Sequence, residues 1–186
     1  MDHTTAEARL LDAADTLFYE RGIQAVGMDA IRQASGVSLK RTYQLFPSKE
    51  HLVEAVLRRR DLAIREQISA YTSARPTPTE GVLAVFDYLY DWFGQPDFRG
   101  CAFINSFAEL GPASANVADI VRTHKQAVAD HLAALVAAAG RPPALAAQLL
   151  VLANGAMVTA AIVGSPEPAR DARAAAQRLL DAGASA

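Results

Sequence analysis

The sequence contains a single cysteine, Cys101, and few features of a secreted or membrane-bound protein. One cysteine cannot form a disulfide within the chain, so it fits a reducing compartment, and a CxxC metal finger is excluded. We expect no apolar run long enough to span a bilayer. The first residues, MDHTTAEARLL, lack the basic start and apolar stretch of a signal peptide. We therefore expect a cytoplasmic protein that makes no contact with a membrane.

Motifs of common enzyme classes are also missing. The sequence has no GxSxG, no phosphate-binding P-loop and no HExxH. Cys101 has no helper residue near it in the sequence, which favours a buried small side chain over a redox-sensing thiol. We predict that the chain is not an enzyme and uses no cofactor.

The net charge of the 186 residues is only −2, but the charges are unevenly distributed. Residues 32–60 contain seven basic and two acidic side chains, whereas residues 61–186 contain nine basic and twelve acidic ones. A local excess of positive charge is typical of a surface that meets an anion, although a solvated helix face has the same composition. The charge pattern therefore becomes informative only in combination with a structural motif.

Residues 28–46 supply that motif. An apolar helical pattern runs to Gly36, a second short helix begins after Ser38, and Pro47 ends it. Glycine can adopt the positive φ of a sharp turn, serine is a good N-cap, and proline disfavours a helical residue before it. Two short helices joined in this way predict a helix-turn-helix, whose second helix can enter a DNA major groove.

The rest of the chain also has the spacing of α-helices. We predict an all-α protein with about nine helices and no strand, and 51% apolar residues allow a buried core. The segment 144–163 is apolar on all sides but contains Gln148, Asn154 and Thr159, which indicates a helix buried on every side, partly by another subunit.

The chain resembles the TetR family of bacterial transcriptional regulators. The resemblance is densest from Ala14 to Leu57 and rests on Phe18-Tyr19-Glu20-Arg21-Gly22, Ile31, Ala34, Ser35-Gly36-Val37-Ser38, Tyr43, Phe46, Ser48-Lys49-Glu50 and Leu52. It implies a DNA-binding domain at residues 1–48 and an effector-binding and dimerisation domain at residues 49–186. It also implies that the last two helices, at about 144–163 and 167–182, form a homodimer.

The sequence departs from the family pattern at three places. Val26 and Gly27 stand where relatives often have the serine or threonine that caps the second helix and touches a phosphate. Lys40 replaces a residue that is commonly small, and Thr42 replaces a common leucine. The base preference of relatives therefore does not carry over to this chain.

The resemblance and the local charge together predict the residues that bind a double-stranded DNA operator. Arginine and glutamine side chains can read base edges, whereas lysine, serine and tyrosine commonly hold the phosphate backbone. The predicted DNA-binding residues are Ser38, Lys40, Arg41, Thr42, Tyr43, Gln44 and Lys49. Tyr43 has a packing role within the motif as its alternative, and Arg58, Arg59 and Arg60 are expected to be solvated or interdomain residues.

A small-molecule effector would need a mostly apolar pocket with a few polar anchors. The predicted lining residues are Phe86, Leu89, Tyr90, Phe93, Phe103, Asn105, Phe107, Glu109 and His124. Each aromatic residue alone also fits a plain core. The polar residues Asn105, Glu109 and His124 leave three interpretations: a hydrogen-bond network, a ligand anchor, or a metal site in which Glu109 and His124 are weak candidate ligands.

We therefore predict a ligand-responsive DNA-binding regulator, a homodimeric repressor released from a palindromic operator by a small molecule. The alternative is a helical sensor of small molecules or metals that has little or no sequence-specific DNA binding.

Overall fold

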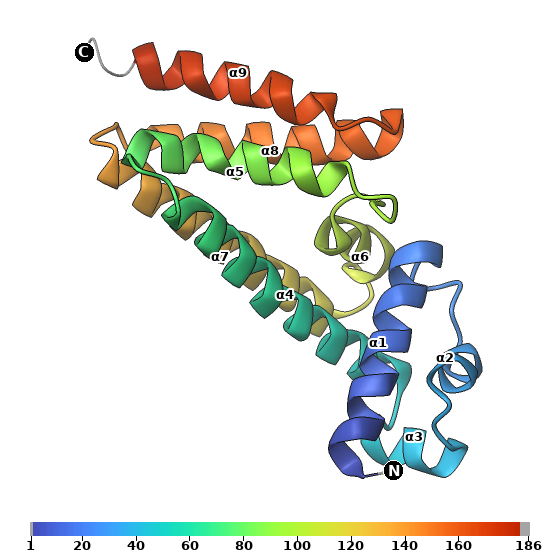
Figure 1. The fold of residues 1–186 in the computed structure, drawn as a ribbon. Helices are drawn as coiled ribbons and strands as arrows, with labels where there is room; N and C mark the ends of the chain where they lie inside the picture. Colours follow the sequence, from blue (N-terminus) through green and yellow to red (C-terminus); the bar gives the residue numbers. More distant parts are fainter. Residues whose placement is uncertain (1, 183–186) are drawn as a thin grey trace. The chain divides into compact units, whose positions relative to one another are not determined.

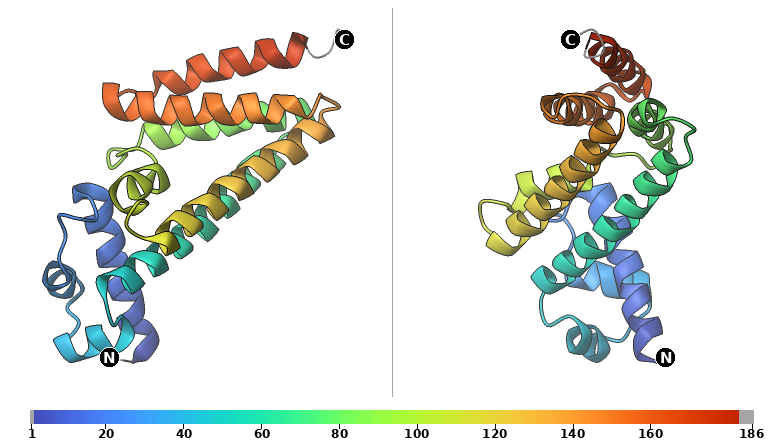
Figure 2. Two further views of the ribbon diagram at one scale, coloured as in Figure 1. Left: turned by 180° about the vertical axis from the view of Figure 1, so that it is seen from behind. Right: turned by 90° about the vertical axis from the view of Figure 1, so that its left-hand side faces the viewer.

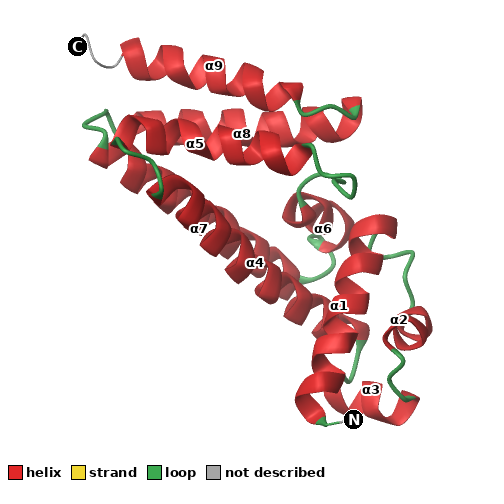
Figure 3. Cartoon of the chain, viewed as in Figure 1, coloured by secondary structure: helices red, strands yellow, loops and turns green. Residues whose placement is uncertain are grey.

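A computed structural model describes residues 2–182, and every regular element in that range is an α-helix (Figure 1, Figure 3). The prediction of an all-α protein with about nine helices is confirmed. The helices of the described range are α1 (His3–Arg21), α2 (Met28–Ser35), α3 (Leu39–Leu45), α4 (Lys49–Ser73), α5 (Pro78–Phe93), α6 (Ala102–Leu110), α7 (Ala115–Ala138), α8 (Ala144–Val163) and α9 (Glu167–Ala182).

Local capping interactions explain where several helices begin and end. Thr77 caps α5: its Oγ1 accepts from Glu80 N (3.2 Å) and donates to Glu80 Oε2 (2.8 Å). Pro78 follows at the first position of the helix, where a missing N–H costs nothing. At a C-terminal end, helix α8 is terminated by Gly164, which adopts the left-handed conformation with φ +68°.

The chain divides into two compact units. Unit 1 comprises Met1–Leu62 and Ala102–Arg122, and unit 2 comprises Ala63–Cys101 and Thr123–Ala186. Helices α4 and α7 therefore each contribute residues to both units. The predicted division at residues 48 and 49 concerns function and stays a prediction.

In unit 1, α1 packs against α2 and α3 (Figure 1). The core is apolar: Leu10, Ile31, Leu52 and Phe103 are completely buried, and they come from α1, α2, α4 and α6. Burying a large apolar side chain contributes roughly 1.5–3 kcal/mol relative to leaving it exposed. This shared core fixes the helix-turn-helix on the rest of its unit.

In unit 2, α9 lies against both α5 and α8 (Figure 2). Phe86, Leu149 and Leu180 are fully or almost fully buried between these helices. Small residues on α9 allow close packing, and an ion pair between Arg173 Nε and Asp87 Oδ1 (2.6 Å) joins α9 to α5 at the edge of the core. The three helices thus pack against one another in pairs around a shared core.

A row of aromatic rings runs along one side of α5 in unit 2. Tyr71 meets Tyr88 at 5.7 Å between ring centroids, Tyr88 meets Trp92 at 6.4 Å, and Trp92 meets Phe98 at 5.2 Å. The Tyr71 hydroxyl donates to Asp91 Oδ2 (2.6 Å), and this hydrogen bond raises the pKa of Tyr71. Trp92 is the only tryptophan in the sequence.

Helix α8 is partly exposed within the chain. By length and hydropathy alone it is long and apolar enough to cross a membrane, so the expectation that no run reaches this length was wrong. It nevertheless packs against α5 and α9, and its Asn154 accepts a hydrogen bond from Lys125 Nζ (2.7 Å). Its exposed apolar residues, among them Val151 and Ile162 at 71% and 79% exposure, are not covered within one chain, so the expected burial by another subunit stays a prediction.

The turn between α2 and α3 generates a stability prediction. Gly36 has φ +67°, so Gly36→Ala should lower the free energy of unfolding by about 1–2 kcal/mol, the cost of a left-handed non-glycine residue. Urea unfolding of both proteins measures the difference. Gly94→Ala is the control, because Gly94 has φ −74° and a Cβ there would meet its nearest atoms at an ordinary 3.6 Å; an equal loss in both variants would contradict this role of Gly36.

Candidate functional site

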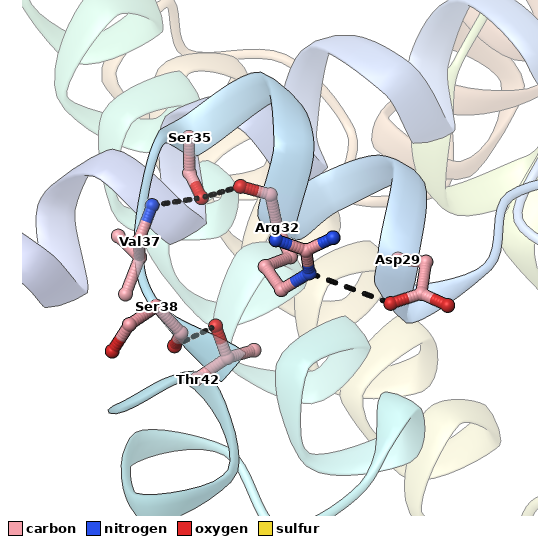
Figure 4. A network of polar contacts seen from close by, with 6 residues as sticks. All are labelled: Asp29, Arg32, Ser35, Val37, Ser38 and Thr42. Atoms are coloured by element: carbon pink, nitrogen blue, oxygen red, sulfur yellow. Dashed lines mark hydrogen bonds and ion pairs between the residues drawn. The ribbon is translucent and has the colours of Figure 1, made fainter. Parts of the chain in front are cut away.

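The turn of the helix-turn-helix is fixed by its own polar groups (Figure 4). The Ser35 hydroxyl donates to Arg32 O (3.1 Å) and accepts from Val37 N (3.3 Å). Gly36 takes the left-handed conformation between them, and Val37 is 2% exposed, so its side chain plugs the space between the two helices. The turn therefore satisfies its backbone groups while it aims α3 away from α2.

Ser38 caps α3 as predicted, with its Oγ accepting from Arg41 N at 3.4 Å. Thr42 lies on the inner side of α3: it is completely buried, and its hydroxyl donates to Ser38 O (3.1 Å; Figure 4). A side chain in that position cannot reach a DNA surface. Thr42 therefore holds α3 in the motif, and we leave it out of the candidate interface.

The outer side of α3 is polar and basic. Gly36, Ser38, Lys40, Arg41 and Gln44 line one shallow concave surface of about 570 Å³. Tyr43 is 47% exposed, which separates it from the motif core and leaves its ring and hydroxyl accessible. Four of the seven predicted DNA-binding side chains thus share one surface, and Tyr43 is exposed on the same helix.

The start of α4 adds a positive helix end. Ser48 Oγ accepts from His51 N (3.5 Å) and is 2.9 Å from His51 Nδ1, so Ser48 acts as the predicted cap. A hydrogen bond from Ser48 lowers the pKa of Glu50. Lys49 is the first residue of α4, where backbone N–H groups and the helix dipole favour an anion.

Three consecutive arginines of α4 have partners within unit 1. Arg59 Nη1 lies 2.7 Å from Asp12 Oδ1, and Arg60 Nε lies 2.7 Å from Asp15 Oδ1, both on α1. Arg58 is 3.4 Å from Glu54 on its own helix. Arg59 and Arg60 hold α4 to α1, so two of the seven positive charges counted over residues 32–60 are paired with carboxylates on α1.

The apolar and aromatic residues proposed for an effector pocket are mostly core residues. Phe86, Leu89 and Phe93 are at most 5% exposed in unit 2, and Phe103 is fully buried in unit 1. Tyr90 is half-buried below the guanidinium of Arg170, at 4.1 Å. In contrast, Phe107 is 43% exposed.

Glu109, at the end of α6, holds the turn that leads from α1 to α2. Its two carboxylate oxygens accept from Ile23 N (3.1 Å) and Gln24 N (2.9 Å), and its backbone oxygen accepts from Gln24 Nε2 (2.7 Å). We call this set of three hydrogen bonds the Glu109 clamp. It supports the hydrogen-bond interpretation for Glu109.

The other polar candidates lie in different units. Asn105 lines a cavity in unit 1 together with Glu109, whereas His124 is 4% exposed in unit 2. Among residues 2–182, no group of three or more His, Cys, Asp or Glu side chains could hold a metal ion. The metal interpretation of Glu109 and His124 therefore gains no support.

The cavity in unit 1 has a volume of about 330 Å³ and is bounded by α1, α4 and α6. The sequence interpretation placed Asn105 and Glu109 in a pocket but missed Asp15, Tyr19 and Arg60, which also line this cavity. Part of this lining could have been recognised from the sequence, because Asp15 and Tyr19 are four residues apart and therefore share a face of α1.

Cys101 is buried, as expected for a small apolar side chain. Its sulfur is 3.7 Å from Lys125 Nζ, which also donates to Asn154. No local sequence pattern pointed to this lysine, because it lies 24 residues further along the chain.

A helical chain that presents a basic, exposed second helix from a helix-turn-helix has the features of the DNA-binding regulators built on this motif. Residues 10–56 match the family model described as bacterial regulatory proteins, tetR family. SCO4454, a TetR-family transcriptional regulator from Streptomyces coelicolor, is 33% identical, with a TM-score of 0.90 over 97% of this chain and 96% of that one. The chain belongs to the TetR family, as its sequence indicated.

Other relatives agree with this class. A putative TetR transcriptional regulator from Streptomyces avermitilis MA-4680 is 29% identical, with a TM-score of 0.84 over 96% of this chain and 97% of that one. The transcriptional activator FasR of Mycolicibacterium smegmatis is 38% identical over 85 residues, which are 44% of this chain and 39% of FasR. The match to this curated relative thus spans well under half of its length. The predicted class, a regulator and not an enzyme, is that of these relatives.

The Glu109 clamp generates a prediction. Glu109→Ala should lower the free energy of unfolding by about 1–3 kcal/mol, because two backbone N–H groups lose a charged acceptor. Hydrogen exchange should be faster at Ile23 and Gln24 than in the native chain. Asp119→Ala, which removes a carboxylate paired with the exposed Arg122, is the control; unchanged exchange at Ile23 and Gln24 in Glu109→Ala would contradict the clamp.

Proposed function

We propose that this chain is a transcriptional regulator whose helix α3 binds the major groove of an operator. The observation that carries the proposal is the basic concave surface formed by Ser38, Lys40, Arg41 and Gln44 on a helix-turn-helix. It is supported by membership of the TetR family, whose named members are transcriptional regulators.

The exposed side chains divide into two roles. Ser38, Tyr43 and Lys49 would hold phosphates, because hydroxyl groups and a lysine at a helix start suit the DNA backbone. Arg41 and Gln44 would read base edges, arginine preferring guanine and glutamine adenine. Lys40 lies on the same concave surface and would add a further contact to the DNA.

We propose a homodimer formed through α8 and α9. Exposed Val151 and Ile162 on α8, and a shallow apolar surface formed by residues of α8 and α9, need a cover in water. A twofold dimer would present two copies of α3 to a palindromic operator. The two copies must then lie about 34–36 Å apart, or a multiple of that distance.

We propose further that the regulator is cytoplasmic and acts as a repressor that a small molecule releases from DNA. The ligand must bind the DNA-free conformation more tightly, and coupling of this kind is typically about 1–3 kcal/mol. Helix α4 contains residues of both units, which makes it the natural element to shift with the ligand.

DNA binding is tested by fluorescence anisotropy with the DNA that flanks the gene and with random DNA, at two salt concentrations. Tight binding that prefers the flanking DNA and falls steeply with salt is expected. Lys49→Ala should weaken binding to both DNAs and reduce the salt slope by about 1, and Tyr43→Ala should also weaken binding.

Arg122→Ala is the control, since it removes a positive charge from an exposed ion pair on α7. Unchanged affinity in both Tyr43→Ala and Lys49→Ala would refute the assignment of the exposed side of α3 and the start of α4 to DNA binding. Weak and equal binding to both DNAs would instead favour a helical sensor without sequence-specific DNA binding.

The dimer is tested by light scattering after size exclusion. The mass measured for the native protein should be twice that of one chain. Val151→Glu should lower the measured mass to that of one chain, because an unpaired charge buried in the interface costs several kcal/mol. Leu62→Glu is the matched control, since Leu62 is a large apolar residue, 56% exposed, on α4. A dimeric Val151→Glu variant would place the interface elsewhere.

A further inference from the structure

The cavity of unit 1 has mostly apolar walls and contains one guanidinium group, that of Arg60, which is hydrogen-bonded to Asp15. Its apolar lining comes from Phe18 and Ile23 on one side and from Val53, Val56 and Leu57 on α4. Its volume of about 330 Å³ is at the small end of the range for ligand sites, roughly 300–1,000 Å³. The space therefore fits a small and mostly apolar molecule.

Arg60 is the one positively charged residue among those that line the cavity. Its Nε donates to Asp15 Oδ1 (2.7 Å), and its guanidinium lies 4.4 Å above the centre of the Tyr19 ring. Within the described part of the chain these are its polar contacts, and neither uses an Nη group. Asp15 and Tyr19 thus fix the guanidinium in place while its Nη donors stay available to a ligand.

The charges of the lining select among ligands with an acceptor group. Asp15 and Glu109 carry two negative charges against the one positive charge of Arg60. A carboxylate ligand would add a third negative charge within the cavity. A cation would meet Arg60 itself, while the Tyr19 ring already faces a guanidinium and both oxygens of Glu109 already accept backbone hydrogen bonds. An uncharged acceptor avoids both penalties.

We propose that this cavity binds a small, uncharged, mostly apolar carbonyl compound, whose oxygen accepts from the Nη groups of Arg60. Gly22, Ile23 and Glu109 also line the cavity, so the ligand would lie beside the Glu109 clamp. Its affinity then depends on the position of the turn that leads into the helix-turn-helix. This second part, coupling to the operator, rests on the proposed function, whereas binding itself does not.

The test titrates the ¹⁵N-labelled full-length protein, without DNA, with three one-ring compounds: acetophenone, benzoate and benzylamine. Acetophenone should give saturable shifts of the amide signals of Ile23 and Gln24, and the two charged compounds should bind at least tenfold more weakly. Equal binding of all three, tighter binding of either charged compound, or no saturation with acetophenone would overturn the proposal.

Two variants test the location of the site. Ala102→Leu should abolish acetophenone binding by filling the cavity from the first residue of α6. Ala115→Leu, the same change at the first residue of α7, lies outside the lining and should bind as the native chain does. Retained binding in Ala102→Leu would overturn the location. Both variants are first checked for native helical circular dichroism and melting temperature.

Arg60→Gln tests the acceptor contact. It should weaken acetophenone binding about tenfold, since a hydrogen bond to a charged group is lost. Unchanged affinity in this variant would overturn the role of Arg60. If the variant unfolds because Asp15 loses its partner, the comparison of the three compounds on the native chain still decides the ligand class.

A last titration repeats the acetophenone series with operator DNA present. A changed affinity for acetophenone supports the coupling, and by linkage the compound changes operator affinity by the same factor. An unchanged affinity overturns the coupling but leaves the binding site standing. A protein that binds acetophenone but no DNA would refute the proposed function alone.

Discussion

The Glu109 clamp is the constraint on which the position of the helix-turn-helix within unit 1 depends. One carboxylate on α6 accepts the backbone N–H groups of Ile23 and Gln24, just after α1, where the chain has left its helix and has no other described partners for them. Hydrogen bonds to a charged group are about twice as strong as neutral ones. The clamp acts together with the Arg59 and Arg60 ion pairs, which join α4 to α1. Both α4 and α6 therefore hold α1 and the turn that follows it, and α2 and α3 pack against α1.

The helices and the motif could be predicted because their signals are local. Ser38, Gly36 and Pro47 lie within a few residues of the ends that they define, and the structure places helix boundaries beside each of them. The cap that Thr77 forms with Glu80 at the start of α5 is equally local. A side chain that caps its own helix needs no information from elsewhere in the fold. This explains why an all-α fold and its turn could be predicted from the sequence.

The contacts that build the site could not be predicted in the same way. Ile23 and Glu109 are separated by 86 residues, and Asp15 and Arg60 by 45, so no spacing rule connects them. Thr42 shows the complementary problem: helical spacing places it among exposed donors, but packing turns its hydroxyl inward to Ser38. Polar residues are assigned to a binding face by composition, whereas tertiary packing decides which of them point to solvent.

The position of Trp92 has a practical consequence for studying this protein. It is the only tryptophan in the sequence, and in unit 2 it stacks on Tyr88 and meets Phe98 edge-on. The aromatic side chains of unit 1 are tyrosine and phenylalanine. Its emission spectrum is therefore a native optical probe of unit 2 alone. Comparing its melting curve with far-ultraviolet circular dichroism, which reports all helices, would show whether the two units unfold as one cooperative block or in sequence.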